Sequence, residues 1–499
     1  MNSANRWSLL GRALVALLLT VGFYTLALGI AFGLLYLIYL EVVVVGRVNI
    51  RLTVGAFIGA VVILWAIFPR IDRFEPPGPR LTRQNFPDLF KQIEGVARST
   101  RQSMPRDVYL IPDVNAFVAE RGGFMGIGSR RVMGIGLPLF HLVTINELRS
   151  ILAHEFGHFY GGDTALGPWI YKTRAAIIRT VMSVGQTSQL LQAPFNSYAK
   201  MFLRVTNAIS RQQEFTADAL SARVVGRQIA VSGLQKIHRY GVAFQSFFQQ
   251  EYAPVLNAGF QAPMIQGFER FIHSPSISEA ISKMYEEQLT KQETNPYDTH
   301  PSLKERIAAL ESLPTRAETE SEPAHVLLAN TYDLERQLLK VIAVDKDKVK
   351  SLKEINWEDT TEKIFLPQWE KSVKIYSSIL KDLTTASLPE LAGDNFSLFV
   401  KAVRTGKILP ANVEPKQVAP ESQVQIVNNV LGAGLAVALH RDGWQIETCI
   451  GQGFFFVKGD NKLEPFRVYL KLLSKEWSGE QWMQTCSQFG IADLKLGNQ

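Results

Sequence analysis

Two charge-free apolar segments near the N-terminus constrain the fold of this chain most strongly. Residues 13–40 and residues 52–68 contain no charged side chain. A helix of about 20 apolar residues crosses a hydrocarbon layer about 30 Å thick, so the first segment is long enough and the second is just sufficient. A cleaved signal peptide fits poorly, because the first apolar run is too long and a second run follows it. The sequence therefore predicts a membrane anchor over residues 1–70 with two transmembrane helices.

Basic residues around these segments predict their orientation. Six arginines flank the pair on its outer ends: Arg6, Arg12, Arg70, Arg73, Arg80 and Arg83. The short connector contains Arg47 and Arg51 against Glu41. Because short loops rich in Lys and Arg stay on the cytoplasmic side, both ends are expected there. The predicted location is the inner cell membrane, multi-pass, with the soluble part facing the cytoplasm.

The charge balance limits the classes of partner. The formal net charge is only +7 over 499 residues, which suits a protein beside an anionic inner leaflet. Nucleic-acid binding would need a basic, aromatic-rich stripe, and nucleotide binding a G-x-x-x-x-G-K-[ST] loop; the sequence has neither. The expected partners are the lipid bilayer and a protein or peptide substrate, with no nucleic acid and no nucleotide. The two cysteines, Cys449 and Cys486, indicate no disulfide framework.

Residues 154–158 read His-Glu-Phe-Gly-His, the H-E-x-x-H pattern. Residues four apart lie on one face of a helix, so His154 and His158 can hold one metal ion. Glu155 then lies beside the ion and suits a general base that takes a proton from metal-bound water. Apolar residues recur at helical spacing around the pattern, and Thr144 or Asn146 is expected to cap this helix. A buried helix with two histidines by chance is the alternative.

A third metal ligand is expected from residues 211–223, a second segment of helical character. Glu214 and Asp218 are four residues apart and therefore share a face. Glu214 can reach the metal, while Asp218 can orient a ligating histidine from behind. Two acids on a helix are usually only a solvated face, but the upstream pattern reverses that expectation.

The sequence HEFGHFYGGD, followed downstream by EFTAD, resembles the gluzincin membrane peptidases that include HtpX and the CAAX prenyl endopeptidases. The resemblance covers roughly residues 85–312. It implies one zinc ion per chain, with Glu155 as general base and three metal ligands: His154, His158 and Glu214. It also implies supporting roles for Asp163 and Asp218.

Two further matches to this family suggest residues that contact the substrate. A peptide can add itself as a strand to a sheet edge, here beside Asn115, Ala116 and Phe117. The alternative is an ordinary packed strand. His300, in a Thr-His-Pro turn, is expected to support the oxyanion of the tetrahedral intermediate, although a histidine in such a turn is more often a surface residue. Weaker candidates of the same kind are His141, Tyr160 and Arg211.

The chain departs from HtpX between the two motifs, where HtpX has two further membrane spans. Residues 165–213 carry five basic side chains, and their one charge-free window, residues 180–199, is interrupted by polar residues. Amphipathic helices on the protein or at the lipid interface therefore fit this segment better than membrane spans.

The predicted fold class is α+β and mostly helical, with a zincin-like catalytic domain that contains a small β-sheet. The boundaries follow composition: a proline-rich linker over 71–84, the metallopeptidase domain over 85–314, an acidic linker over 315–323 and an accessory region over 324–499. Within the catalytic domain we expect a helix over 85–101 and strands over 107–112, 115–118 and 131–135.

The accessory region is expected to be helical over residues 324–385 and α+β over residues 386–499. Alternating segments at 443–450 and 453–460, together with the apolar segment at 466–473, suggest a small α+β module. The sequence of this region contains no metal-ligand cluster, nucleophile–base pair or nucleotide motif.

The predicted function is that of a membrane-anchored zinc endopeptidase that cuts loosely folded or membrane-associated proteins, in quality control or processing. One alternative is a CAAX-type processing protease, which would need a large intramembrane chamber that two spans do not supply. The other is a catalytically silent membrane scaffold, which the presence of Glu155 disfavours.

Overall fold

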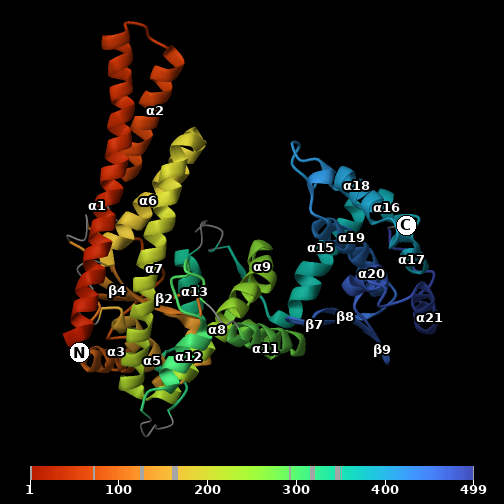
Figure 1. Ribbon diagram of the computed structural model, residues 1–499. Coiled ribbons are helices and arrows are strands. Elements are labelled where there is room, and N and C mark those ends of the chain that lie inside the picture. Colours follow the sequence, from red (N-terminus) through yellow and green to blue (C-terminus); the bar gives the residue numbers. More distant parts are fainter. Residues whose placement is uncertain are drawn as a thin grey trace. The chain divides into compact units, whose positions relative to one another are not determined.

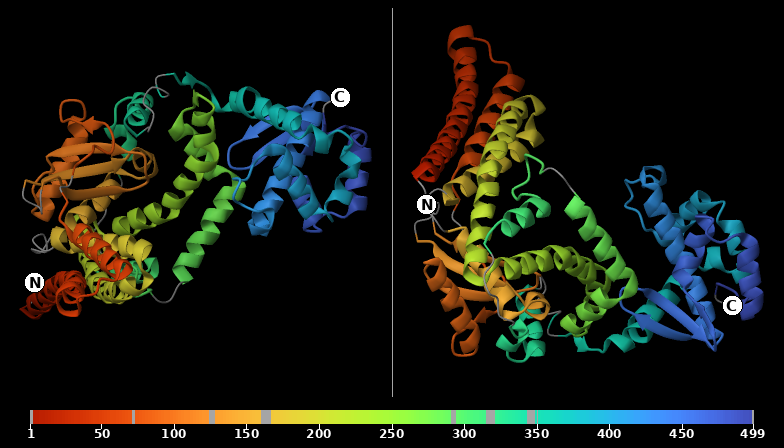
Figure 2. Two further views of the ribbon diagram at one scale, coloured as in Figure 1. Left: turned by 90° about the horizontal axis from the view of Figure 1, so that it is seen from above. Right: turned by 60° about the horizontal axis from the view of Figure 1, so that its bottom comes forward.

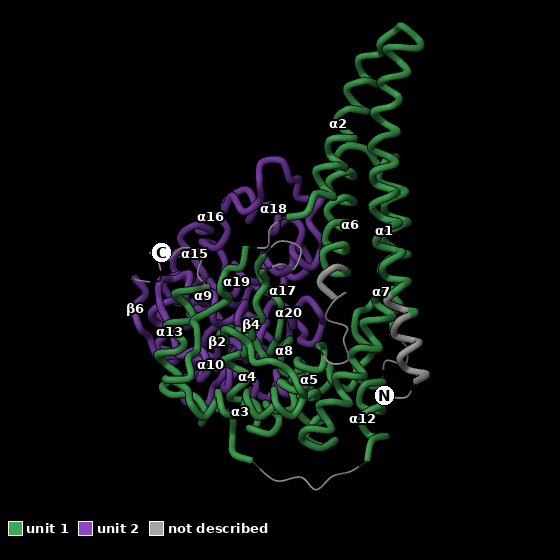
Figure 3. The backbone as a smooth tube through the Cα atoms, turned by 90° about the vertical axis from the view of Figure 1, so that its left-hand side faces the viewer, with its two compact units in different colours: residues 1–242, 281–344 green, residues 243–280, 345–499 purple. Residues whose placement is uncertain are grey.

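The computed structural model describes residues 3–70, 73–123, 128–159, 167–290, 294–314, 321–342, 349 and 351–497. The chain divides into two compact units (Figure 3). Unit 1 consists of Met1–Val242 and Ile281–Val344, and unit 2 of Ala243–Ala280 and Asp345–Gln499. Both units are mostly helical and contain small sheets, so the predicted α+β, mostly helical class is confirmed at that level. The domain limits derived from the sequence stay predictions.

The two apolar N-terminal segments form an antiparallel pair of helices in unit 1 (Figure 1). Helix α1 (Ser3–Tyr39) continues as a π-helical turn (Leu40–Val45), and α2 (Ile50–Ile67) returns beside it. The stretches Leu14–Val45 and Ile50–Ile67 have mean hydropathies of 2.4 and 2.2, and only 6% and 33% of their most apolar windows are buried. Both helices are therefore long and apolar enough to cross a membrane and present most of that surface outward.

Helices α6 (Gly167–Thr187) and α7 (Gln189–Val225) form a hairpin that packs along α1 and α2 (Figures 1 and 2). A shared apolar core contains Phe23 of α1, Ile63 of α2, and Phe195 and Phe202 of α7. The Tyr198 hydroxyl donates a hydrogen bond to the carbonyl of Leu19 over 2.6 Å. The described part of the region between the two motifs, from residue 167 on, is thus helical, as expected, and is attached to the apolar pair.

The main sheet of unit 1 lies beside this helical bundle and has the strand order β1-β2-β4-β3. Its strands are β1 (Arg80–Leu81), β2 (Asp107–Ile111), β3 (Ala116–Arg121) and β4 (Arg130–Gly136). Strands β2 and β4 are parallel, and the other pairs are antiparallel. β3 therefore lies at one edge of the sheet, and the three strands expected from the sequence are all present.

The remaining helices described for unit 1 are α3 (Pro87–Thr100), α4 (Leu137–Leu142), α5 (Ile145–Gly157), α12 (Leu303–Glu311) and α13 (Thr331–Ile342). Helices α8 (Arg227–Phe247) and α11 (Pro275–Thr290) extend across the boundaries of the units. Part of the predicted acidic linker, residues 315–320, lies outside the described residues. Its end is fixed to unit 1, where the Ile145 N–H donates to the Glu322 carbonyl over 2.9 Å.

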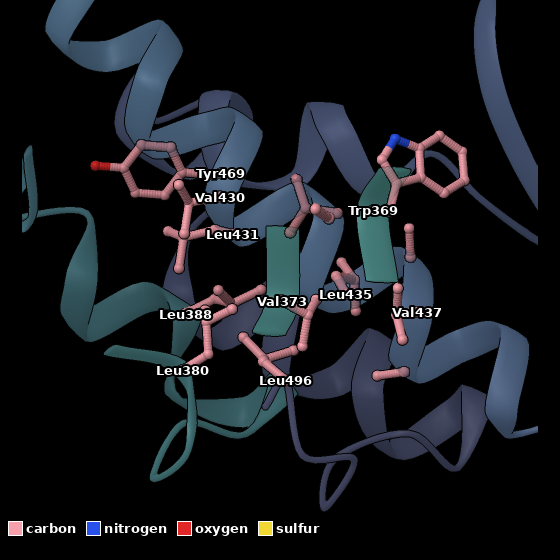
Figure 4. Close-up of a cluster of buried hydrophobic side chains, with 14 of the residues drawn as sticks. Trp369, Val373, Leu380, Leu388, Val430, Leu431, Leu435, Val437, Tyr469 and Leu496 are labelled. Carbon is pink, nitrogen blue, oxygen red and sulfur yellow. The ribbon is translucent and has the colours of Figure 1, made fainter. Parts of the chain in front are cut away.

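Unit 2 is built around α19 (Pro420–Arg441), a helix whose most apolar stretch is 72% buried (Figure 4). Other helices surround it: α15 (Leu366–Ile375), α16 (Ser377–Leu380), α17 (Leu388–Leu391), α18 (Asn395–Gly406), α20 (Pro465–Leu473) and α21 (Gly479–Phe489). A three-stranded sheet has the order β7 (Gln445–Cys449), β8 (Gly453–Lys458) and β9 (Asn461–Leu463). The unit also holds α9 (Ala253–Asn257), α10 (Met264–His273) and the parallel pair β5 (Phe260–Gln261) and β6 (Lys353–Glu354).

The third segment that the sequence assigns to the small α+β module of unit 2 is its helical part. Residues 466–473 form most of α20. The buried residues Val468, Tyr469 and Leu472 are spaced for one face of a helix, and Pro465 occupies the first turn, where its missing N–H is tolerated. The other two segments form β7 and β8 as expected.

Candidate metal centre

Helix α5, which carries the H-E-x-x-H pattern, is fixed firmly at its start. Thr144 caps it in a capping box with Glu147, so Thr144 and not Asn146 is the N-cap. The buried Glu147 carboxylate also accepts a bond from Lys236 of α8 at 2.7 Å. Burial alone would raise the pKa of Glu147, but hydrogen bonds from Lys236 and Ser232 outweigh it and lower the pKa. The orientation of α5 is therefore set more than two turns before His154.

Close contact between α5 and α7 brings the two sequence motifs together. A Cβ atom on Gly157 would lie 2.7 Å from the Cα atom of Ala217, so only glycine allows this approach. Farther along the contact, the Ser221 hydroxyl donates to the Ser150 carbonyl over 2.9 Å. Glu214 lies on the same face of α7 as Ala217 and Ser221, and therefore faces α5.

The acidic side chains of α7 meet the two histidines of α5. His154 Nδ1 lies 2.9 Å from Asp218 Oδ1, and His154 Nε2 lies 3.5 Å from Glu214 Oε2. His158 Nε2 lies 3.7 Å from Glu214 Oε1. The two imidazole rings are nearly perpendicular, with centroids 4.8 Å apart. One glutamate thus faces both histidines, while Asp218 contacts the far nitrogen of His154.

These positions fit a shared metal ion. Two donors that each lie about 2.0–2.1 Å from one tetrahedral zinc ion are about 3.4 Å apart, close to the two distances from Glu214 to the histidines. The Glu214 Oε2 atom is buried and makes no hydrogen bond to any described residue. Donor atoms of His154, Glu155 and His158 also lie within 4.8 Å of one another. The set therefore supplies at least three nitrogen or oxygen donors around one point.

Arg306 of α12 completes the back of the site. Its Nε donates to Asp218 Oδ2 over 2.8 Å, and its Nη2 donates to Asp218 Oδ1 over 2.7 Å. Its Nη1 lies 3.4 Å from Glu214 Oε2. Burial would raise the pKa of Asp218, but these bonds outweigh it and lower the pKa. The guanidinium therefore keeps Asp218 charged, and for Glu214 it adds to the contacts with His154 and His300, which lower the pKa of that carboxylate.

Sequence reasoning did not identify Arg306 as part of the site, although a signal was present. Leu303, Ile307 and Leu310 form the buried apolar face of α12, and Arg306 lies on that face with them. A buried arginine needs a carboxylate partner, so its position within an apolar stripe indicates an ion pair.

His300 lies next to Glu214, with its Nδ1 2.9 Å from Glu214 Oε1 and its side chain 61% exposed. The segment before it is bound to α7. Asn207 donates to the Tyr297 carbonyl over 2.6 Å, and Arg211 donates to the Asp298 carbonyl over 2.8 Å. Arg211 therefore holds this segment in place instead of contributing to the cleft.

His141 stacks against His325, with ring centroids 5.3 Å apart, and does not line the cleft. Tyr160 and Asp163 lie outside the described residues.

The histidines and Glu155 differ in their proton affinity. Burial raises the pKa of Glu155 to about 7, and the charge of Glu214 acts in the same direction. Burial lowers the pKa of His158 to about 4. Burial would also lower the pKa of His154, but its contacts with Asp218 and Glu214 outweigh burial and raise it to about 9. Near neutral pH, Glu155 can thus both accept and release a proton, which suits a general base.

The site opens into a cleft of about 410 Å³ that lies entirely within unit 1. Its lining includes the three residues expected to contact a substrate: Asn115, Ala116 and Phe117. The lining also includes His238, which the sequence did not single out and whose pKa burial lowers to about 4. The backbone N–H of Val118, in edge strand β3, bonds to the Glu155 carboxylate. The sheet edge and the histidine pair therefore border one cavity.

Comparison with known proteins agrees with this geometry. Residues 83–314 match the model of Peptidase family M48. This chain carries a peptidase family M48 domain. The resemblance inferred from the motifs is confirmed, and the M48 match and the HtpX relatives support a membrane-associated metalloprotease.

Relatives of the M48 domain share modest identity. A "Protease HtpX homolog" of Paenarthrobacter aurescens is 26% identical over 252 residues, which cover 47% of this chain and 75% of the relative. "Protease HtpX" of Salmonella arizonae is 24% identical over 288 residues, which cover 52% of this chain and 83% of the relative. No solved structure matches the chain.

Proposed function

We propose that this chain is a zinc endopeptidase, anchored by α1 and α2 as two membrane spans, with a zincin-like active site on the cytoplasmic side. One observation carries the proposal. The two histidines of α5 and Glu214 of α7 converge at distances of 3.5 and 3.7 Å, with Glu155 in the same cleft. Arginines at the outer ends of the two apolar segments support the cytoplasmic orientation.

His154, His158 and Glu214 would hold the zinc ion. When bound, the ion would lower the pKa of a coordinated water and polarise the scissile carbonyl. Asp218 contacts Nδ1 of His154, which leaves Nε2 of that ring as the donor on the cleft side. Arg306 keeps Asp218 charged and fixed by its two hydrogen bonds. Asp163, for which the sequence predicts a supporting role, stays a candidate of the same kind.

Glu155 moves the proton in the proposed reaction. Its carboxylate takes a proton from the attacking water and then passes it to the nitrogen of the leaving amine. The pKa of about 7 suits both halves of this transfer. His300 is exposed beside Glu214 and can donate a hydrogen bond to the oxyanion of the tetrahedral intermediate.

The open edge of β3 is the proposed substrate platform. The Asn115 carbonyl accepts a bond from the Gly136 N–H, on the inner side facing β4. In an antiparallel pair the backbone groups alternate in direction, so those of Ala116 and Val118 face the open edge, where the Val118 N–H bonds to Glu155. A peptide bound there must be extended. We infer that the substrates are loosely folded or membrane-associated proteins, consistent with quality control or processing.

Two glutamine variants test the assignment of the carboxylates. Glu155→Gln should keep stoichiometric zinc and lose about 10²–10⁴-fold in peptide hydrolysis, because only the proton transfer is removed. Glu214→Gln should lose zinc as well as activity, because a metal ligand is removed. Glu311→Gln, at an exposed position of α12, is the matched control and should behave as the unchanged protein. Metal content by mass spectrometry and hydrolysis of an unfolded protein such as casein give the two readouts.

The opposite pattern would contradict the assignment. If Glu214→Gln retained zinc while Glu155→Gln lost it, Glu155 would be the ligand. Faster cleavage of a prenylated peptide than of casein would favour the CAAX-type alternative. Unchanged cellular function in Glu155→Gln would favour a scaffold.

A further inference from the structure

We propose that residues 179–200, the adjoining ends of α6 and α7, are a third membrane element: a helical hairpin that enters one leaflet and ends near the middle of the bilayer. This inference rests on the proposed function only in taking α1 and α2 as membrane-spanning. We propose that lipid acyl chains cover the outer face of the hairpin.

Contacts with α2 set the depth of the hairpin. Arg179 donates to the Ala66 carbonyl over 3.2 Å, at the C-terminal end of α2. Near the tip, the Leu191 Cδ1 atom would be only 3.1 Å from a Cβ on Gly59, so Leu191 packs directly on that glycine. Gly59 lies midway along α2 (Ile50–Ile67). Seven residues separate Gly59 from Ala66, which corresponds to about 10 Å of helix.

The hairpin is therefore shorter than the apolar pair beside it. In Figure 1 its tip ends well short of the loop that joins α1 and α2. A hydrocarbon core is about 30 Å thick, so the hairpin covers roughly one leaflet.

The charge pattern agrees with this depth. No charged residue occurs from 180 to 199, and one basic residue stands at the base of each leg, Arg179 on α6 and Lys200 on α7. Long basic side chains at a lipid boundary can keep their charged ends in the headgroup layer. Because Arg179 contacts the end of α2, the base of the hairpin lies at the level where α2 ends.

Several polar groups of the turn are satisfied within the hairpin, which lowers the cost of insertion into hydrocarbon, while the Gln186 and Gln189 side chains at the tip are exposed. The Ser188 N–H donates to the Val184 carbonyl over 2.8 Å, and the Gln192 N–H donates to the Ser188 carbonyl over 3.1 Å. The Ser188 hydroxyl caps α7 by accepting from the Leu191 N–H. The Gln192 side chain bridges the legs through a 3.0 Å bond to the Val181 carbonyl. The polar residues that interrupt the apolar window thus include the groups that close the turn.

Apolar side chains lie on both faces of the hairpin. Val184 and Phe195 are buried against α1 and α2. On the outer side, Leu190 at the tip is 85% exposed and Met182 is 63% exposed. The hairpin packs directly on α1 and α2, whose exposed apolar surface is the surface proposed to face lipid. This packing against the proposed anchor identifies acyl chains as the occupant.

Spin-label accessibility in the full-length protein tests the proposal. In a background with Cys449→Ser and Cys486→Ala, a nitroxide is attached to one new cysteine at a time: Leu190→Cys at the hairpin tip, Phe57→Cys on the exposed face of α2, or Val242→Cys on the soluble part. Each protein is placed in phosphatidylethanolamine–phosphatidylglycerol vesicles. Relaxation by dissolved oxygen and by a water-soluble nickel chelate is then measured.

We expect the Leu190 probe to resemble the Phe57 probe. Both should be readily relaxed by oxygen, and both should be about tenfold less accessible to the nickel chelate than the Val242 probe, because a polar complex is excluded from hydrocarbon. A Leu190 probe as accessible to nickel as the Val242 probe, with the Phe57 probe protected, would overturn the hairpin and leave the anchor intact. A Leu190 probe accessible to neither reagent would overturn the lipid assignment in favour of protein cover. A nickel-accessible Phe57 probe would refute the anchor itself.

Discussion

The contact between α5 and α7 in unit 1 and the core around α19 in unit 2 show two different uses of burial. The first buries charged and polar groups, among them Glu214, Asp218 and Arg306. The second buries apolar side chains such as Leu435 and Val437 (Figure 4). Buried charges are tolerated only with partners, so the polar contact depends on each of its members. An apolar core depends mainly on filled volume and tolerates repacking.

This difference predicts which property each change affects. Changes in the polar contact should affect metal binding and activity, whereas changes in the apolar core should affect unfolding alone.

Arg306→Met should cause the largest loss, because it leaves the carboxylates of Asp218 and Glu214 without their buried partner. Breaking a buried ion pair on one side costs about 3–5 kcal/mol. We expect zinc affinity, measured by titration, and the unfolding midpoint of unit 1 both to fall. The control is Arg270→Met, whose partner Glu358 is exposed. Equal effects of the two substitutions would contradict the role assigned to Arg306.

Leu435→Ala should destabilise unit 2 by about 2–5 kcal/mol through the lost transfer free energy and the cavity that remains. Zinc content and peptide hydrolysis should stay unchanged under conditions where the protein is folded. Denaturant unfolding followed by tryptophan fluorescence gives the first readout, with Met483→Ala at an exposed site as control. Loss of zinc in Leu435→Ala would remove the contrast between the two cores.

Gly157→Ala should separate α5 from α7, since its methyl group would lie 2.7 Å from Ala217 Cα. Overpacking of this kind costs about 1–3 kcal/mol, and we expect weaker zinc binding as Glu214 moves away from the histidines. The matched control is Gly95→Ala in α3, where the added methyl meets no neighbour within 4 Å. That control should stabilise the protein by about 0.5–1 kcal/mol. Normal zinc affinity in Gly157→Ala would show that the contact is not needed.

Zinc affinity should depend on pH in a defined direction. The pKa of His154 is raised to about 9, and a metal binds only the neutral imidazole, so each bound ion displaces one proton below that pH. Between about pH 6 and 8 the apparent association constant should rise about tenfold per pH unit, or about 1.4 kcal/mol. Asp218→Asn removes a cause of the raised pKa and should flatten this slope. A slope near zero in the unchanged protein would contradict the pairing of His154 with Asp218.

Much of the site could be predicted because its residues follow local rules. An i, i+4 spacing places His154 and His158 on one face, and the same rule groups Glu214 with Asp218. The structure brings these four side chains together and places His300 beside Glu214. Their catalytic roles stay predictions until tested.

The residues that sequence reasoning missed depend on contacts between distant segments. Arg306 reaches Asp218 from another helix, and Gly157 matters only because Ala217 of α7 lies against it. Helical periodicity places a residue on a face but does not say what covers that face. The same limit applies at 466–473, where the sequence predicts an α+β module and the burial of Val468, Tyr469 and Leu472 on one face shows a helix.

Helix α7 is continuous from Gln189 to Val225, so it fixes the distance between the hairpin and the metal site. Fourteen residues separate Lys200, at the base of the hairpin, from Glu214, so the helix places Glu214 about 21 Å from Lys200 along its axis. An extended polypeptide covers the same distance with about six residues, at about 3.3–3.6 Å each. If the base of the hairpin marks the lipid surface, a membrane-embedded substrate must release at least that length of chain before cleavage. A substrate whose segment outside the membrane is shorter than this would not reach the metal site and would not be cleaved.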